Sequence, residues 1–291
     1  MIFLILSIAM SSVINVVFRL IGNHQIDNQL AITVNYITCV ITGLITLQFM
    51  GKPFPIDLEA AWFRMSVALG ALFILVFMGM AVTAQRSGIS VSVVAAKMGV
   101  VFPVIFALIY LGEPTTLLLL AGIILSLTSV YLIARKTIHG EKIDHPSMWL
   151  PFLVFLGSGT IDLFLSLVER DLPTGLSEVV PAILIFASAA AWGIVVMMIR
   201  LIRGRIRITA NGVYAGILLG IPNFFSIYFV IAALHSGFLA TSRIFPINNV
   251  GIVLLSTLIS ILFFKERLNN RNLIGLLFAV LSILLISGIF D

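Results

Sequence analysis

The sequence predicts an all-α integral membrane protein with ten transmembrane helices arranged as two inverted five-helix repeats. Three observations predict this fold class. The 291 residues are 60% hydrophobic and 10% charged, with a mean hydropathy of +1.19, whereas a soluble domain is about half apolar and a quarter charged. Apolar runs long enough to cross a bilayer follow one another along the chain. One segment also recurs at an offset of 153 residues.

The first apolar run has no basic residue ahead of it, and Arg19 follows its core. We therefore interpret it as a spanning helix rather than a signal peptide. A spanning helix needs ~20 mostly apolar residues, and by this measure no part of the chain is left for a soluble domain. In order, the predicted spans are 2–22, 30–49, 62–84, 89–111, 115–134, 149–168, 178–201, 210–234, 239–264 and 271–290.

The longest polar connection, 135–148, separates a first five-helix repeat (1–134) from a second (149–291). The segment "YLGEPTTLLLLAGIILSLTSVYLI" (110–133) aligns with "FFKERLNNRNLIGLLFAVLSILLI" (263–286). The polar and glycine matches are Glu113 with Glu266, Gly122 with Gly275 and Ser129 with Ser282. Because five is odd, the second copy enters the membrane from the opposite face. Inverted repeats recur in secondary transporters, with the substrate site near the midplane between the halves.

These features resemble the EamA-type drug/metabolite transporter superfamily. In the layout of its helices the resemblance covers the whole chain. In sequence motif it covers only "LGEPTTLLLLAG" and "FKERLNNRNLIG", and each of these segments has a Glu followed nine residues later by a Gly. Pro103 fits the proline common in the helix before the first Glu. The second half departs from this pattern, with Ser256 at the matching position and Pro246 earlier. The resemblance implies a transporter, with substrates that range from amino acids to sugars, nucleotide sugars and toxic compounds.

Glu113 is the only charged residue between Lys97 and Arg135, at the junction between two predicted helices. Pro114 suits the first position of a helix, and a carboxylate just before it lies near the positive end of the helix dipole. We therefore expect Glu113 to start a helix at the water interface. It serves as a landmark of the repeat rather than as a substrate ligand.

The Lys and Arg residues outside the spans are distributed unequally between the two faces. Three lie on the N-terminal side and twelve on the opposite side. The positive-inside rule makes the twelve-residue side cytoplasmic and leaves both termini outside the cytoplasmic membrane. Many ten-helix relatives are thought to keep both termini inside, so the two arguments disagree.

Polar residues inside spans are costly and indicate functional sites. At ~1.5 Å of rise per residue, Lys97, Asp162, Asn223 and Asn248 lie within about 6 Å of the midplane of a core that is ~30 Å thick. A structural Lys97–Asp162 pair and amide hydrogen bonds between helices are the alternatives. The candidate substrate-binding residues are Lys97, Asp162, Asn15, Asn223, Asn248 and Arg243.

Three prolines lie within predicted helices, close in sequence to these polar residues: Pro103, Pro222 and Pro246. Each lacks an N–H and frees a carbonyl one turn earlier, and in a bilayer that carbonyl needs protein or a water-filled cavity around it. The prolines therefore predict kinks suited to alternating access, although proline is also common in membrane helices. Gly212, Gly216 and Gly220 form a stripe that favours helix contact within the chain over a dimer interface.

The sequence contains no G-x-x-x-x-G-K-[ST] motif, and its four His residues lack metal-ligand spacing. We expect no enzyme activity, no cofactor, no metal site and no nucleic-acid partner. We expect a monomer or weak dimer that moves a small polar metabolite, an amino acid or related zwitterion, across the cell inner membrane, with a possible coupling proton. An exporter of amphipathic compounds that uses the Phe-rich segment after Pro222 is the first alternative. A channel or a non-transporting membrane protein is the second.

Overall fold

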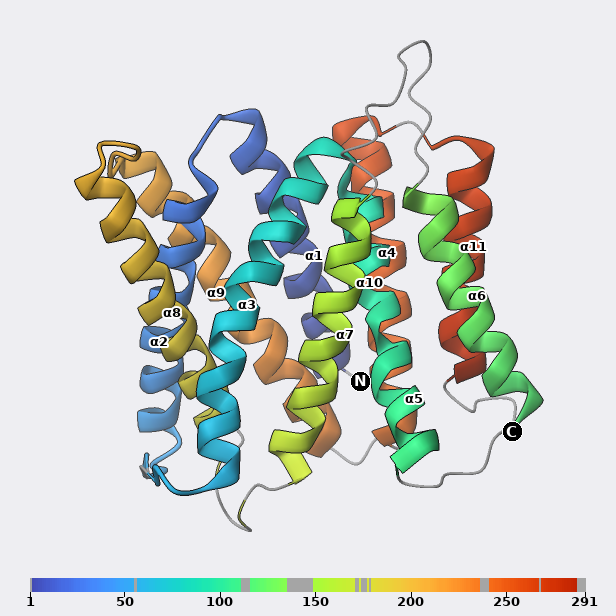
Figure 1. Cartoon of the computed structure of the whole chain (residues 1–291), viewed down its shortest axis with the longest axis horizontal. Helices are drawn as coiled ribbons and strands as arrows, with labels where there is room; N and C mark the ends of the chain where they lie inside the picture. Colours follow the sequence, from blue (N-terminus) through green and yellow to red (C-terminus); the bar gives the residue numbers. More distant parts are fainter. Residues whose placement is uncertain are drawn as a thin grey trace.

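The computed structural model of the chain is a bundle of helices (Figure 1). It describes residues 2–54, 57–110, 116–134, 149–170, 173, 177, 179–235, 241–266 and 268–286. Among these residues every regular element is helical. The elements are α1 (Ile2–Asn23), α2 (Asn28–Phe49), α3 (Ala61–Arg86), α4 (Ile89–Lys97), the 3-10 helix η1 (Met98–Val100), α5 (Val101–Tyr110), α6 (Leu117–Ala134), α7 (Trp149–Arg170), α8 (Val179–Ile202), α9 (Ala210–His235), α10 (Thr241–Phe264) and α11 (Asn270–Ile286).

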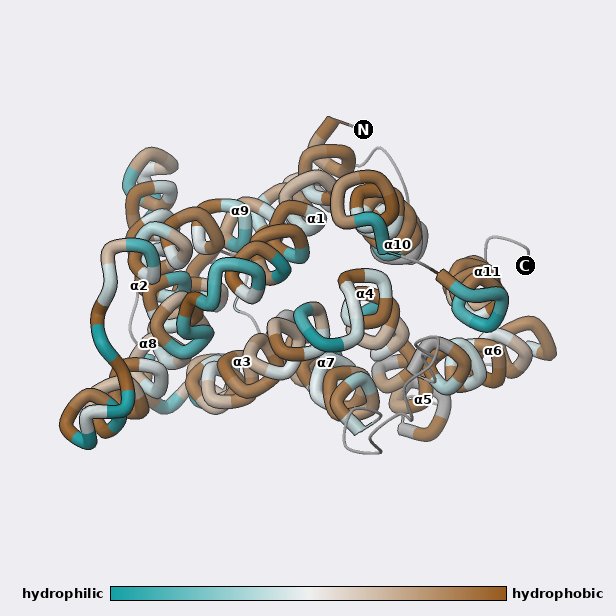
Figure 2. Tube along the Cα trace, turned by 90° about the horizontal axis from the view of Figure 1, so that it is seen from above, coloured by the Kyte–Doolittle hydropathy of each residue, from teal (hydrophilic) through white to brown (hydrophobic). Residues whose placement is uncertain are grey.

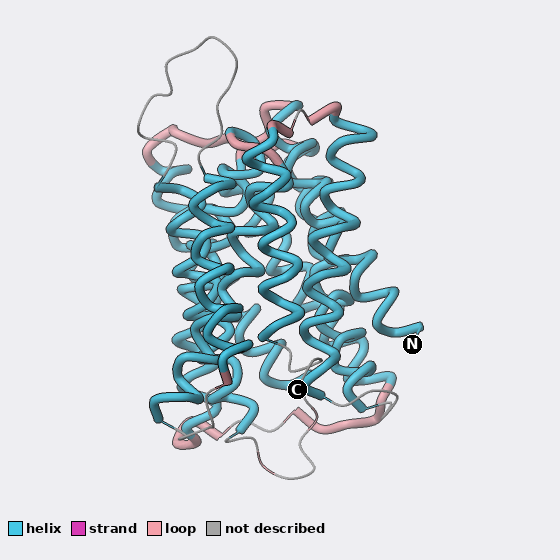
Figure 3. The backbone as a smooth tube through the Cα atoms, turned by 90° about the vertical axis from the view of Figure 1, so that its right-hand side faces the viewer, coloured by secondary structure: helices cyan, strands magenta, loops and turns pink. Residues whose placement is uncertain are grey.

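Seven of the described helices are long and apolar enough to cross a membrane, and three shorter ones are also apolar. Large apolar side chains such as Ile41, Leu44 and Trp192 are exposed on the outside of the bundle. In water such a surface would be an aggregation site, whereas lipid accepts it. Figure 3 shows the helices running side by side with the loops gathered at both ends. The expectation of an all-α, membrane-embedded protein is therefore confirmed.

The helices surround the middle of the bundle in two rows. Seen from above, α9, α1 and α10 form one row, and α3, α7 and α4 form the facing row (Figure 2). Within the first row α1 packs against α9 and α10, and within the second α7 packs against α3 and α4. Helix α4 also contacts α10, which joins the rows. The candidate residues of α1, α4, α7 and α10 thus lie on neighbouring helices.

The fourth predicted span, 89–111, is not one regular helix. It consists of α4, the 3-10 turn η1 and α5. The turn falls one helical turn before Pro103, where the sequence predicts a freed carbonyl at Gly99. Because Pro103 cannot donate to that carbonyl, the regular pattern of hydrogen bonds is interrupted there, and the chain tightens. A 3-10 stretch inside a helix often marks a hinge.

An ion pair and two helix caps hold the basic end of the bundle. Asp27 accepts a hydrogen bond from the backbone N–H of Leu30 at the start of α2 and pairs with Arg200 at 2.9 Å. Arg19 donates to the carbonyls of Ala84 and Gln85 at the end of α3, at 3.1 and 2.5 Å. A cation at a helix C-terminus is favourable. This side chain therefore caps a neighbouring helix.

The glycine stripe of α9 packs against α2. A side chain at Gly216 would overlap Val34, and one at Gly220 would lie 2.6 Å from the Cβ of Thr38 and 2.7 Å from the carbonyl oxygen of Asn35. The two backbones are therefore in close contact. The prediction that this stripe forms a contact within the chain is confirmed.

Gly88, which precedes α4, has a φ of 106° and lies against the carboxylate of Glu266 from the α10–α11 turn. The Ser260 hydroxyl also donates to this carboxylate. Glu266 therefore places a negative charge at the start of α4, which is favourable at a helix N-terminus. This contact joins the α3–α4 connection to the α10–α11 connection at the basic end of the bundle.

The substitution Gly88→Ala is expected to lower the melting temperature clearly more than Gly51→Ala does. Both glycines have positive φ, 106° and 61°, but no atom lies within 4 Å of a side chain at Gly51. Gly51→Ala thus carries only backbone strain of about 1–2 kcal/mol, whereas Gly88→Ala must also displace the Glu266 carboxylate. Thermal unfolding of the two variants in detergent measures the difference. Equal shifts would contradict the contact between Glu266 and the start of α4.

Candidate functional site

Lys97 ends α4 directly before the 3-10 turn, inside an apolar segment that runs from 89 to 110. Its neighbours Ala95, Ala96 and Met98 are buried, whereas Lys97 itself is partly buried. An ammonium group at this depth is costly without water, an anion or a ligand near it. The break in the helix therefore coincides with the charged residue.

Two glycines bring α7 into backbone contact with this break. A side chain at Gly99 would lie 2.5 Å from the backbone nitrogen of Gly159, and one at Gly159 would lie 2.8 Å from the carbonyl oxygen of Gly99. The carbonyl that Pro103 frees is therefore covered by α7 rather than exposed to lipid, as a bilayer requires. A larger residue at either position would separate the helices.

Asp162 lies three residues beyond Gly159, on the same side of α7. It is partly buried, and its charge interacts with that of Lys97. Within the part of the chain that the structure describes, no hydrogen bond or direct ion pair joins the two side chains. The structure thus brings Lys97 and Asp162 together around the glycine contact, as two attracting charges that do not touch. An anionic group can bind at Lys97 and a cationic group at Asp162.

Asn15 belongs to a second polar cluster, between α1 and α10. Its amide donates to the Ser11 carbonyl at 2.9 Å and lies 3.5 Å from the Ser256 hydroxyl, which donates to Ser12 at 3.2 Å. Asn15, Ser12 and Ser256 are all buried. The sequence singles out Asn15 alone, because serines are common in membrane helices. The alignment of Ser256 with Pro103 was the signal that could have drawn attention to it.

Asn223 lies apart from both clusters, between α9 and α2. Its amide donates to Asn35 at 3.2 Å, and the Cys39 thiol lies 3.4 Å from the Gly220 carbonyl. These residues are buried among apolar side chains, and Phe224 is part of the same core. In this structure Asn223 ties two helices together. A role for it in substrate binding stays a prediction.

The remaining candidates lie on α9, α10 and α5. Asn248 is buried on α10, and Pro222 is buried inside an unbroken α9. Arg243 and Pro246 lie in the first two turns of α10, and Pro103 lies in the first turn of α5. The side chains of these last three residues are outside the described part of the structure.

The repeat landmarks lie at contacts between helices. Gly122 of α6 packs against Leu285 and Ile286 of α11, and Ser282 donates to its carbonyl at 2.8 Å. Gly275 is buried on α11. Glu113 is outside the described residues, so the expectation for it stays untested.

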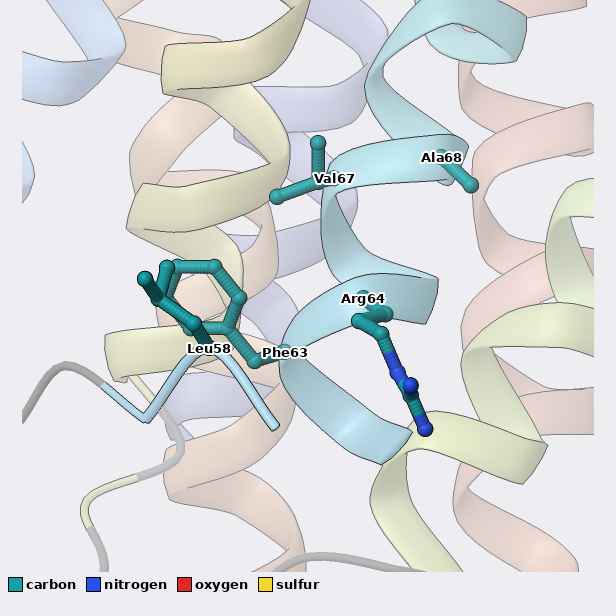
Figure 4. A pocket seen from close by; sticks show the side chains of 5 residues that line it. All are labelled: Leu58, Phe63, Arg64, Val67 and Ala68. Carbon is teal, nitrogen blue, oxygen red and sulfur yellow. The ribbon is translucent and has the colours of Figure 1, made fainter. Parts of the chain in front are cut away.

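A pocket of about 380 Å³ lies at the start of α3, lined by Leu58, Phe63, Arg64, Val67 and Ala68 (Figure 4). Its walls come from one short stretch of chain, and the Arg64 side chain points away from Leu58 and Phe63 (Figure 4). It contains none of the candidate residues. Among the described residues, no group of three His, Cys, Asp or Glu side chains could hold a metal ion.

Comparison with known proteins gives the fold and no activity. No family model matches the chain. The chain is 28% identical over 285 residues to an uncharacterized protein of Haemophilus influenzae, with 96% of this chain and 95% of the relative covered. It is also similar to a crystal structure with 15% identity and a TM-score of 0.64, with 98% of this chain and 94% of the other covered. The likeness to a solved structure therefore extends along nearly the whole chain.

Proposed function

We propose that this chain is a secondary transporter that moves a small zwitterion, an amino acid or a related molecule, by alternating access. The observation that supports this most is the pair Lys97 and Asp162 on either side of the Gly99–Gly159 contact. Charged groups inside the membrane mark substrate or ion pathways. Their position at a broken helix is typical of transporter sites.

Ten crossings in two inverted halves are the architecture we propose, together with membership of the EamA-type superfamily. Seven long and three shorter apolar helices support ten crossings. The packing supports the inversion: α2 packs on α9 as its counterpart α8 packs on α3, and α1 packs on α9 as α7 packs on α3. The counterparts α6 and α11 pack on each other. Such pairing is expected around a pseudo-twofold axis in the membrane plane.

In the proposed mechanism Lys97 binds the substrate carboxylate and Asp162 binds its ammonium group or a coupling proton. The 3-10 turn and the glycine contact let α4 pivot on α7 while the carbonyl of Gly99 stays covered. The site then opens first to one face of the membrane and later to the other. The basic end faces the cytoplasm in this proposal, and a fluorescent reporter fused after Asp291 tests the orientation.

A thermal-shift screen of the purified protein against a metabolite library is the first test of the substrate class. Amino acids or related zwitterions are expected to raise the melting temperature, since a ligand that binds only the folded state stabilises it. Counterflow in proteoliposomes then tests transport with the ligands found. Saturable counterflow supports a carrier, whereas uptake that is linear in concentration and indifferent to preloading indicates a channel and contradicts the proposal.

A further inference from the structure

The cluster between α1 and α10 leaves one acceptor free. The Asn15 amide nitrogen reaches toward Ser256, the Ser256 hydroxyl donates to Ser12, and the Ser12 hydroxyl donates to the carbonyl of Ile8 at 2.8 Å. In this series of hydrogen bonds, each donor is paired with an acceptor of the next residue. The side-chain oxygen of Asn15 is buried and has no hydrogen-bond partner among the described residues.

The orientation of the Asn15 amide follows from its neighbours rather than from the placement of its atoms alone. The atom 2.9 Å from the Ser11 carbonyl oxygen must be the nitrogen, because a carbonyl oxygen only accepts. The oxygen, Oδ1, therefore points away from Ser11. A buried acceptor without a donor is unfavourable, and such groups in native proteins need an explanation.

Asn15 lies at the same place along α1 as Asp162 does along α7. Helices α1 and α7 each have 22 residues, and the two side chains are the fourteenth residue of each. Asn15 also lies at the depth of Lys97, since each is eight residues, or about 12 Å, from the basic end of its helix. Helix α10 contacts both α1 and α4. The free oxygen of Asn15 thus lies on a helix that contacts α4, the helix that carries Lys97.

We propose that Asn15 Oδ1 accepts a hydrogen bond from a second donor of the transported zwitterion, a hydroxyl or amide N–H on its side chain, and that Ser256 and Ser12 hold the amide in this orientation. The inference rests on the proposed transport function and narrows its substrate class. Lys97 and Asp162 bind the charges common to all amino acids. Asn15 selects those that carry a further donor, because an analogue without one leaves the acceptor unpaired.

The test compares isosteric ligands that differ in this donor, L-threonine against L-valine and L-asparagine against L-leucine, by thermal-shift titration. The wild-type protein is expected to bind the donor-bearing member of each pair about tenfold more tightly. In Asn15→Leu this preference is expected to vanish, while the affinity for valine and leucine is retained. Ser256→Ala leaves Oδ1 in place but releases its orientation, and it is expected to reduce the preference about threefold.

Gln29→Leu is the matched control, because its buried side-chain amide already donates to the carbonyl of Gly193 on α8 at 3.3 Å. It is expected to keep the preference for the donor-bearing ligand of each pair, which Asn15→Leu is expected to lose. Threonine preference that persists in Asn15→Leu overturns the inference and leaves transport intact. Loss of the threonine preference in Gln29→Leu as well would also overturn the inference, since the loss would then be a general effect of removing a buried amide. If none of the four ligands shifts the wild-type protein, the proposed substrate class fails together with the inference.

Discussion

Lys97→Met is expected to reduce saturable uptake in proteoliposomes by at least about 100-fold, because the substrate carboxylate loses its counter-charge inside the membrane. It is also expected to destabilise the protein, since Asp162 loses the positive charge that attracts it. The cost is expected to lie below the ~3–5 kcal/mol for breaking a buried ion pair, because the two charges do not touch and both side chains are partly exposed. Asp162→Asn is expected to lose uptake to a similar degree.

The double variant Lys97→Met with Asp162→Asn separates the functional role from the structural one. With both charges removed, the unpaired charge is gone, and the melting temperature is expected to return close to the wild-type value. Uptake is expected to stay absent. Lys52→Met is the matched control, because Lys52 is exposed in the α2–α3 connection, and it is expected to transport normally. Wild-type uptake in both Lys97→Met and Asp162→Asn would remove the site assignment.

Composition and the succession of apolar runs predict the helical membrane fold. Depth along each helix selects Lys97 and Asp162 as candidate substrate-binding residues near the midplane. Rise per residue gives the height of a side chain in the membrane but not the direction in which it points. For this reason the depth argument places Asn223 with Lys97 near the midplane, although the Asn223 amide donates to Asn35 between α9 and α2. The sequence does not single out Asn35, because its role depends on Asn223, which lies 188 positions away.

The contact between Gly99 and Gly159 could not be predicted from either helix alone. Pro103 predicted a freed carbonyl at Gly99, and the 3-10 turn agrees with that expectation. What covers the carbonyl depends on the rotation and crossing of α7. A single glycine in "LGSGTID" (156–162) is unremarkable by itself. The small residues Gly157, Ser158 and Gly159 were the available signal, since such residues favour close helix contacts.

Gly159→Ala is expected to abolish uptake even where the protein still folds. The added methyl group would overlap Phe102 and would lie 2.8 Å from the carbonyl oxygen of Gly99, and backbone cannot yield as a flexible side chain can. The helices must therefore separate, at a cost of about 1–3 kcal/mol for overpacking. Separation also moves Asp162 away from Lys97 and exposes the Gly99 carbonyl, so transport should suffer more than stability does.

Gly79→Ala provides the control, because Gly79 also faces α7 but a side chain there would lie 3.3 Å from a single methyl of Val154, which can shift slightly. Its melting temperature and uptake are expected to stay near wild type. Gly99→Ala, which presses on the same contact from the other side, should reproduce the loss in Gly159→Ala. If Gly159→Ala transports as well as Gly79→Ala, the crossing is ordinary packing and α4 does not pivot there. Loss of uptake in Gly159→Ala and Gly99→Ala, with a fall in melting temperature that is modest relative to Gly79→Ala, supports the contact as a part of the transport site.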